Sequence, residues 1–177
     1  MKTLKLNLLL SALIISLVTF TSCSEDDSDT TPIMLGSSVT VTNTFQSTVF
    51  TNGAELDIED LFQMPAGSLA ATANVSTAVE FPNYLLNLYD INIDGNSISL
   101  EVVAQANDPT YGDLFRILEA DTFDRYYLTF DSAQDVKGFT SSNPSVNLRI
   151  DSDNILVVEI GEGYDFNPDQ NFEIILN

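Results

Sequence analysis

The chain has no histidine, no tryptophan and a single cysteine among its 177 residues. Without histidine it lacks a Ser-His-Asp or Cys-His catalytic arrangement, an imidazole ligand for zinc or haem, and any side chain that ordinarily titrates near neutral pH. One cysteine allows neither an internal disulfide nor a cysteine-rich metal site. These absences exclude most enzyme classes that depend on imidazole or thiolate chemistry.

Positive charge is also scarce. The chain has 6 Lys and Arg residues against 26 Asp and Glu residues, a formal net charge of -20 and a pI of about 4.1. Binding to a phosphate backbone needs a basic surface. We therefore expect no nucleic-acid partner.

The first residues carry the pattern of an export signal. Lys2 and Lys5 precede an uncharged, mostly apolar run over residues 6–20, which is followed by small residues. As a helix this run would span roughly 22 Å, less than the ~30 Å hydrocarbon core of a bilayer. The pattern favours a signal peptide over residues 1–22 that is removed on export; the alternative is an anchor helix retained in the mature protein.

The residues that end this segment, Phe20-Thr21-Ser22-Cys23, resemble the lipobox of bacterial lipoproteins. The resemblance covers only the N-terminal segment. It implies that cleavage leaves Cys23 as the first residue, that its sulfur carries acyl chains such as palmitate, and that these chains hold the protein on a membrane. The acidic run 24–27 is similar to the surface-export signal of Bacteroidota lipoproteins and implies an outer-membrane protein that faces the cell surface; the alternative is the start of a solvated linker.

The acyl chains would have to supply the membrane affinity. Burial of a lipid chain contributes about 0.8 kcal/mol per CH₂, so two or three chains anchor a protein stably. Loss of Lys2 and Lys5 with the signal would leave 4 basic and 26 acidic residues, a net charge of -22. Such a chain is not attracted to an anionic membrane surface.

Composition divides the mature chain in two. Residues 23–36 are mostly polar and acidic, which is typical of a flexible tether. Residues 37–177 are enough for one domain with its own core. We therefore expect a signal peptide, a short tether and a single β-rich domain.

Apolar and polar residues alternate through most of this domain. Residues 84–93 and 97–103 flank Asp94-Gly95 and predict a hairpin, as do Val146, Leu148 and Ile150 with a turn at 151–154 and a return over 155–160. Further strands are expected at residues 39–44, 48–51, 70–81, 126–131 and 172–176.

Two segments have a helical pattern instead. Asp57 is suited to cap a helix over residues 57–64, which Pro65 follows, and a second helix is expected over residues 113–120. Many strands with one or two short helices predict an all-β fold. We expect an antiparallel β-sandwich, with a partly open β-barrel as the alternative.

One segment matches the spacing of a calcium loop. Asp90, Asn92, Asp94, Gly95, Asn96 and Glu101 fit the pattern D-x-[DN]-x-[DN]-G-x₅-E, which sets oxygen ligands at alternate positions and a carboxylate at the twelfth. Strand patterns flank it where an EF-hand has helices. The alternatives are a plain hairpin turn or a calcium site of another kind.

A second set of residues with side-chain oxygens occupies alternate positions in a segment that is predicted to be a loop: Asp165, Asn167 and Asp169. These three side chains could converge on one hard cation such as calcium. The alternative is a turn in which they bond to the neighbouring backbone and which Pro168 closes.

Aromatic residues gather near charged ones at a third place. Phe123, Tyr126, Tyr127 and Phe130 are close in sequence to Asp121, Asp124 and Arg125. Aromatic faces beside such groups hold sugars or peptides. The alternative is that every second aromatic belongs to the core side of one strand.

Two further triplets, Asp29-Thr30-Thr31 and Asp131-Ser132-Ala133, are similar to the O-glycosylation signal of Bacteroidota proteins. Taken together, these features favour a surface lipoprotein that is a non-catalytic binding or accessory subunit, with an outer-membrane protein partner or a glycan or peptide ligand. A calcium-stiffened structural or adhesive module is the alternative. A third hypothesis is a carboxylate-dependent glycoside hydrolase, since a pair of carboxylates can catalyse that reaction without histidine.

Overall fold

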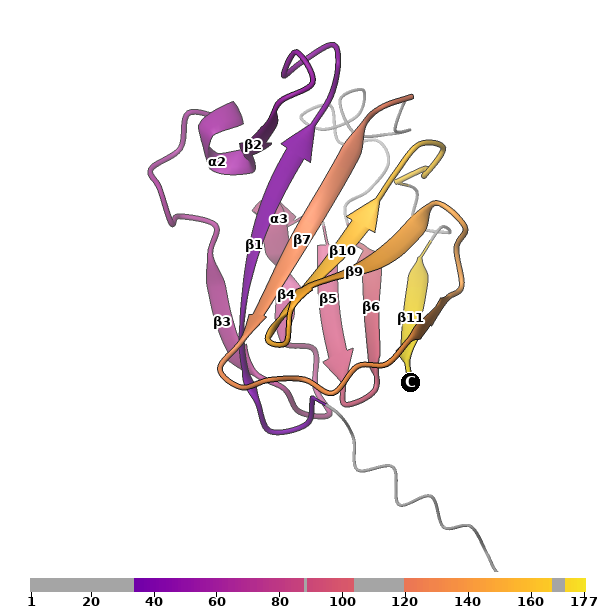
Figure 1. Ribbon diagram of the computed structural model, residues 1–177. Coiled ribbons are helices and arrows are strands. Elements are labelled where there is room, and N and C mark those ends of the chain that lie inside the picture. Colours follow the sequence, from indigo (N-terminus) through magenta and orange to yellow (C-terminus); the bar gives the residue numbers. More distant parts are fainter. Residues whose placement is uncertain (1–33, 88, 104–119, 167–170) are drawn as a thin grey trace, which may run out of the picture. The chain divides into compact units, whose positions relative to one another are not determined.

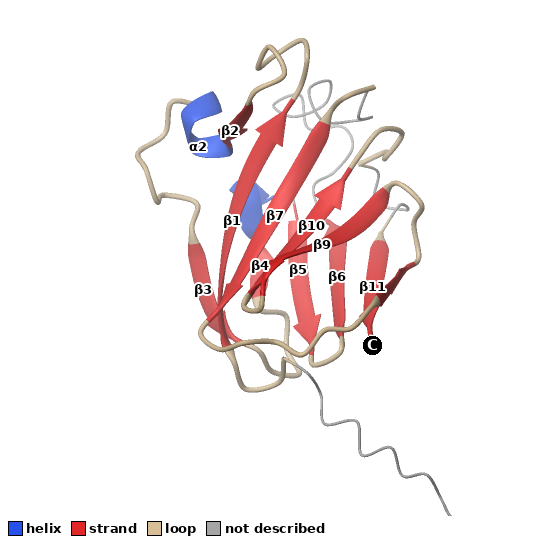
Figure 2. Ribbon diagram, in the orientation of Figure 1, coloured by secondary structure: helices blue, strands red, loops and turns tan. Residues whose placement is uncertain are grey.

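A computed structural model of the chain describes residues 34–87, 89–103, 120–166 and 171–177. These residues belong to one compact unit, Pro32–Asn177. Their strands form two antiparallel sheets that pack face to face (Figures 1 and 2). The predicted β-sandwich is confirmed, and the described strands do not close into the barrel that was the alternative.

Sheet A has the order β2-β1-β7-β10-β9, and β3 pairs with the other half of the β1 edge. Its strands are β1 (Ser38–Gln46), β2 (Glu55–Asp57), β3 (Ala71–Asn74), β7 (Phe123–Phe130), β9 (Val146–Ser152) and β10 (Ile155–Ile160). Sheet B has the order β4-β5-β6-β11-β8. Its strands are β4 (Phe81–Asn83), β5 (Tyr89–Asp94), β6 (Ser97–Val102), β8 (Phe139–Ser141) and β11 (Phe172–Leu176).

The core lies between the sheets and is built by the alternation that the sequence displays. On β1, for example, Val39, Val41, Asn43 and Phe45 are each at most 3% exposed, while the residues that alternate with them point outward. Strands β5, β6 and β11 bury every second residue in the same way. Burial of each such apolar side chain contributes roughly 1.5–3 kcal/mol, so this alternation sets which face of each strand is inside.

Both predicted hairpins form. Strands β5 and β6 pair from Asp94↔Ser97 onward, so the turn residues are Gly95 and Asn96 rather than the expected Asp94 and Gly95. Gly95 has φ 60°, a conformation that two-residue hairpin turns need at their first central position and that glycine adopts without steric cost. Strands β9 and β10 pair up to Ser152↔Ile155, with a register shift beside the turn.

Two strand predictions are wrong. Residues 48–51 belong to a loop between β1 and β2, because Ser47 and Thr51 bond to the loop backbone and compete with strand pairing. Residues 70–81 are divided between β3 in sheet A and β4 in sheet B. The break contains a turn in which the Glu80 carboxylate accepts the N–H of Ser76 at 2.9 Å.

The helices are shorter than expected. Helix α2 (Ile58–Leu61) follows Asp57 as its N-cap but ends before the predicted residue 64, and Gln63 has φ 54°, which a helix does not allow. A second short helix, α3 (Tyr84–Asn87), takes the place of the first residues expected in β5. The helix expected over 113–120 falls outside the described residues except for its last position. No helix in the described part of the chain is long and apolar enough to cross a membrane.

Candidate functional site

The first predicted calcium ligands lie along one strand. Asp90, Asn92 and Asp94 occupy successive outward positions of β5, and Asp90 and Asp94 pair across the hairpin with Glu101 and Ser97. Alternate residues of a strand are about 6.6–6.8 Å apart, so their oxygens diverge instead of surrounding one ion. The Asp90 carboxylate accepts the N–H of Asn83 at 2.7 Å and so links β4 to β5. The segment is therefore a hairpin and does not have the geometry of an EF-hand loop.

Of the second set, Asn167 and Asp169 lie outside the described residues. Asp165 is half-buried, and its Oδ1 is buried without a hydrogen-bond partner. No group of three or more His, Cys, Asp or Glu side chains that could hold a metal ion occurs in the residues that the structure describes. Calcium binding by residues 165–169 stays a prediction.

The structure separates the predicted aromatic cluster into two faces of β7. Tyr126 and Phe130 are 1% and 2% exposed and point into the core, as the alternative had it. Phe123 and Tyr127 point outward with Arg125. The aromatic residues therefore do not form one binding platform; only the outward members are available to a ligand.

The modification sites fall in different places. Cys23 and Asp29-Thr30-Thr31 lie outside the described residues. Asp131-Ser132-Ala133 forms an exposed turn after β7, where the Ser132 hydroxyl lies 3.3 Å from Nε2 of Gln134. Lipidation and glycosylation stay predictions.

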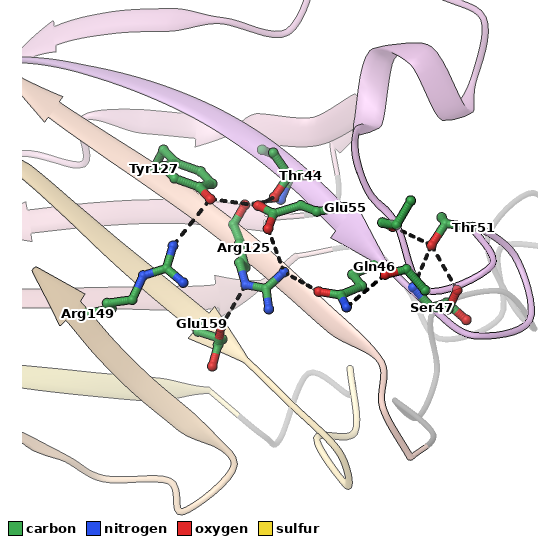
Figure 3. A network of polar contacts seen from close by, with 12 residues as sticks. Thr44, Gln46, Ser47, Thr51, Glu55, Arg125, Tyr127, Arg149 and Glu159 are labelled. Atoms are coloured by element: carbon green, nitrogen blue, oxygen red, sulfur yellow. Dashed lines mark hydrogen bonds and ion pairs between the residues drawn. The ribbon is translucent and has the colours of Figure 1, made fainter. Parts of the chain in front are cut away.

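The outer face of sheet A carries a connected set of polar side chains, called here the outer-face network (Figure 3). It consists of Thr44, Gln46, Glu55, Arg125, Tyr127, Arg149 and Glu159. Strand register brings the members together, since Arg125 on β7 is opposite Thr44 on β1 and Glu159 on β10. Cross-strand neighbours of this kind have Cβ atoms only about 4.5–5.5 Å apart.

Arg125 is the centre of the outer-face network. Its Nε donates to Glu159 at 2.6 Å, and its Nη1 donates to Gln46 at 2.8 Å and to Glu55 at 3.1 Å. The guanidinium also lies 4.8 Å from the centre of the Phe123 ring. The Arg125 side chain is only 8% exposed. One nearly buried cation thus joins β7 to three other strands, β1, β2 and β10, and neutralises two carboxylates.

Glu55 joins the more exposed half of the network. Its Oε1 accepts the hydroxyls of Thr44 and Tyr127, each at 2.6 Å. Partial burial by itself would raise the pKa of Glu55, but these hydrogen bonds and the charges of Arg125 and Arg149 hold that pKa below its usual value. Glu55 is therefore a stably ionised acceptor and is unsuited to act as a general acid near neutral pH.

The 47–54 loop extends from the same edge of sheet A and is held by hydrogen bonds between its own residues. The Thr51 hydroxyl accepts the N–H of Ser47 at 2.9 Å, and the N–H of Thr51 donates to the Ser47 carbonyl at 3.0 Å. Gln46 links the loop to the outer-face network through the carbonyl of Gly53. At the tip, Val49 and Phe50 are 68% and 56% exposed. Two adjacent apolar side chains are thereby presented to solvent on an ordered turn.

A buried polar cluster lies on the core-facing side of β1 and β7. Asp124 is 2% exposed, and its carboxylate accepts from Asn43 Nδ2 at 2.6 Å and from the Tyr126 hydroxyl at 2.8 Å. Burial raises the pKa of Asp124 to about 6, although these hydrogen bonds and the charge of Arg125 act against the shift. Burial, with the charge of Asp124 adding to it, also raises the pKa of Tyr84. Asp124 has the proton affinity of a general acid, yet no substrate can reach it in this structure.

A pocket of about 210 Å³ opens at the edge of sheet A beside this cluster. It is lined by Thr42, Asn43, Asp57, Ile58, Glu59, Ala66, Gly67, Leu69 and Ala70. Neither this pocket nor the role of Gln46, Glu55 and Glu159 in the outer-face network could be predicted from the sequence. The residues that form them do not belong to a recognisable motif.

A scan of the chain against protein-family models finds no match, and searches of curated proteins and of solved structures find no chain with significant similarity.

Proposed function

We propose that the protein is a lipid-anchored binding module on the cell-surface side of the outer membrane. It acts without catalysis, as an accessory subunit that holds an outer-membrane protein partner or captures a glycan or peptide ligand. The observation that carries the proposal is the exposed, ordered tip of the 47–54 loop, which lies at the opposite end of the sandwich from the start of β1 (Figure 1).

The two ends of β1 set this polarity. Near its first residue, Ser38, the chain is fastened to the β5–β6 turn by a 2.9 Å hydrogen bond from the Met34 N–H to the Gly95 carbonyl. The 9 residues of β1 then lead to the 47–54 loop, a distance of roughly 26–30 Å at strand spacing. A tether from Cys23 would join the first of these ends, which leaves the loop free to meet a partner away from the membrane.

The loop has the physical features of an interaction site. Its internal hydrogen bonds fix its conformation before binding, so less conformational entropy is lost on association. Val49 and Phe50 offer apolar surface that a partner can cover, and the neighbouring outer-face network supplies a polar surround. The half-buried Tyr127 and the exposed Arg149 extend this surface with groups that hydrogen-bond to peptides or sugars.

Co-purification from native membranes tests this proposal. Tagged full-length protein and the double variant Val49→Ser, Phe50→Ser should be expressed at equal levels, with Ile175→Ser as the control. Ile175 is 48% exposed on the outer face of sheet B, far from the loop in sequence and on the other sheet. We expect a partner that is retained by the wild type and by the control but lost from the loop variant.

Equal recovery of every bound protein by the loop variant and the wild type would contradict the proposed role of the loop. Circular dichroism of each variant should match the wild type, because both substitutions replace exposed side chains and leave the hydrogen bonds of Ser47 and Thr51 in place.

A further inference from the structure

The edge of sheet A is interrupted in the middle of β1. Strand β3 pairs with β1 as far as Val41, and β2 pairs with it from Thr44 onward, so no strand of the described part of the chain is paired with residues 42–43 on this side. The intervening chain, residues 58–70, arches around the gap and contributes helix α2 and the far wall. The pocket of about 210 Å³ occupies this gap.

The pocket is rich in hydrogen-bond acceptors, and none of the described residues that line it is basic. Asp57 and Glu59 contribute carboxylates, Asn43 contributes an amide, and Ile58 and Leu69 contribute apolar surface. Glu59 also holds the far wall in place, because its two oxygens accept the N–H groups of Gly67 and Leu69, each at 2.5 Å. The pocket therefore has a fixed shape and a negative charge.

Asn43 supplies an acceptor without a partner. The residue is 3% exposed, and its Nδ2 donates to Asp124 and to the carbonyl of Arg125, both on β7. Since these two bonds turn the amide nitrogen toward β7, they turn Oδ1 the other way, toward the edge where the pocket lies. Oδ1 is buried and has no hydrogen-bond partner. A buried amide oxygen without a hydrogen-bond partner has lost its contact with water and gained nothing in return, so a donor in the pocket would be stabilised by reaching it.

Asp57 supplies a second uncommitted acceptor. It is the N-cap residue of α2, yet its side chain makes no capping hydrogen bond. An aspartate at this position usually accepts the N–H of the second or third helical residue. Here the carboxylate is left to face other donors at the rim of the pocket.

We propose that this pocket binds a primary alkylammonium group, carried either by a lysine side chain or by a free small amine. An ammonium has three N–H donors and no acceptor, which suits a site whose polar groups are acceptors. Its alkyl stem would lie against Ile58 and Leu69. The pocket is smaller than the roughly 300–1,000 Å³ of sites for larger ligands. Calcium takes six to eight oxygen ligands, and both side-chain oxygens of Glu59 already accept backbone N–H groups, so the pocket suits a single ammonium better than calcium. The proposal concerns a different part of sheet A from the 47–54 loop and does not depend on the lipid anchor.

NMR titration of the full-length, isotope-labelled protein in neutral detergent tests the proposal. The probes are n-butylammonium and lysine blocked at both ends, and the uncharged control is norleucine blocked in the same way. We expect both cations, but not norleucine, to shift the side-chain amide resonances of Asn43 in a saturable manner. Tighter binding of blocked lysine than of n-butylammonium would identify a lysine side chain as the ligand. Tighter binding of n-butylammonium would identify a free small amine.

The variant Asp57→Asn should weaken binding of the better cation by roughly two- to fivefold, the effect of removing one exposed charge partner. The matched control is Asp60→Asn, since Asp60 is an exposed carboxylate of the same helix that does not line the pocket. It should change the affinity less than Asp57→Asn. Equal effects of the two variants, shifts produced equally by norleucine, or cation titrations that leave the Asn43 amide unmoved would overturn the proposal.

Discussion

The buried carboxylate of Asp124 makes a strong prediction about how stability depends on pH. Asp124 is 2% exposed, and its carboxylate accepts hydrogen bonds from the neutral groups of Asn43 and Tyr126. Among the residues that the structure describes, no cation forms a salt bridge with it. The variant Asp124→Asn keeps the shape of the side chain and an oxygen for Asn43, but it removes the charge. We expect the variant to lack a pH-dependent part of the wild-type stability.

The magnitude follows from the two pKa values of this group. Its pKa is about 6 in the folded protein against an ordinary value of 3.8, a difference that corresponds to about 3 kcal/mol of folding free energy. Because the folded pKa is the higher one, the folded state binds the proton more tightly. The stabilisation is therefore complete below pH 3.8 and is lost as the pH rises through 6. Between pH 7.5 and pH 5 it amounts to about 1.4 kcal/mol.

Urea unfolding of the wild type and of Asp124→Asn at pH 7.5, 6 and 5 measures this effect. The difference in free energy of unfolding, wild type minus variant, should increase by about 1.4 kcal/mol as the pH falls from 7.5 to 5. The comparison cancels the contribution of the other carboxylates, which both proteins share. Asp94→Asn is the control, because Asp94 is exposed at the end of β5, and it should show no such trend. A stability difference between wild type and Asp124→Asn that stays constant over this range would refute the reasoning.

Two further predictions concern the anchor and the outer-face network. Cys23→Ala should release the protein from the membrane fraction, because the variant cannot be acylated and its strongly acidic chain is not attracted to the membrane by charge. Continued tight association would contradict the lipid anchor. Arg125→Met should lower the free energy of unfolding by about 2 kcal/mol, because Glu55 and Glu159 lose their shared cation while both are partly buried. Lys137→Met is its control and should change stability by less than about 0.5 kcal/mol, since Lys137 and its partner Asp135 are 76% and 82% exposed; equal effects of the two variants would show that the network does not stabilise the fold.

The sandwich and both hairpins could be predicted because their signals are local. The alternation of apolar and polar residues over 89–94 and 97–102 indicates which face of each strand is buried, and Gly95 indicates the turn between them. The failures have local causes that alternation does not reveal. Residues 48–51 have the composition of a strand, but the side chains of Ser47 and Thr51 bond the backbone into a loop. The helix expected from residue 57 ends early at a positive φ.

The candidate sites were much harder to predict, because they depend on strand register. The calcium pattern at Asp90, Asn92 and Asp94 matches in spacing, but an extended strand separates ligands that a loop would bring together. Conversely, Glu55 and Arg125 are 70 positions apart and meet only because β2 and β7 flank β1. Spacing along the chain says little about convergence between strands.

The sequence by itself therefore determined the fold class, the faces of most strands and the exclusion of imidazole and thiolate chemistry. These conclusions rest on composition and on side-chain periodicity, which are properties of the chain alone. The signal peptide and the tether stay predictions. Only the tertiary structure decided that Arg125 joins two carboxylates, that Asp124 lies buried behind Asn43, and that a break in the pairing of β1 leaves an acidic pocket. Each of these depends on which strands become neighbours and in what register, and long-range pairing is set by burial across the whole domain rather than by any single segment.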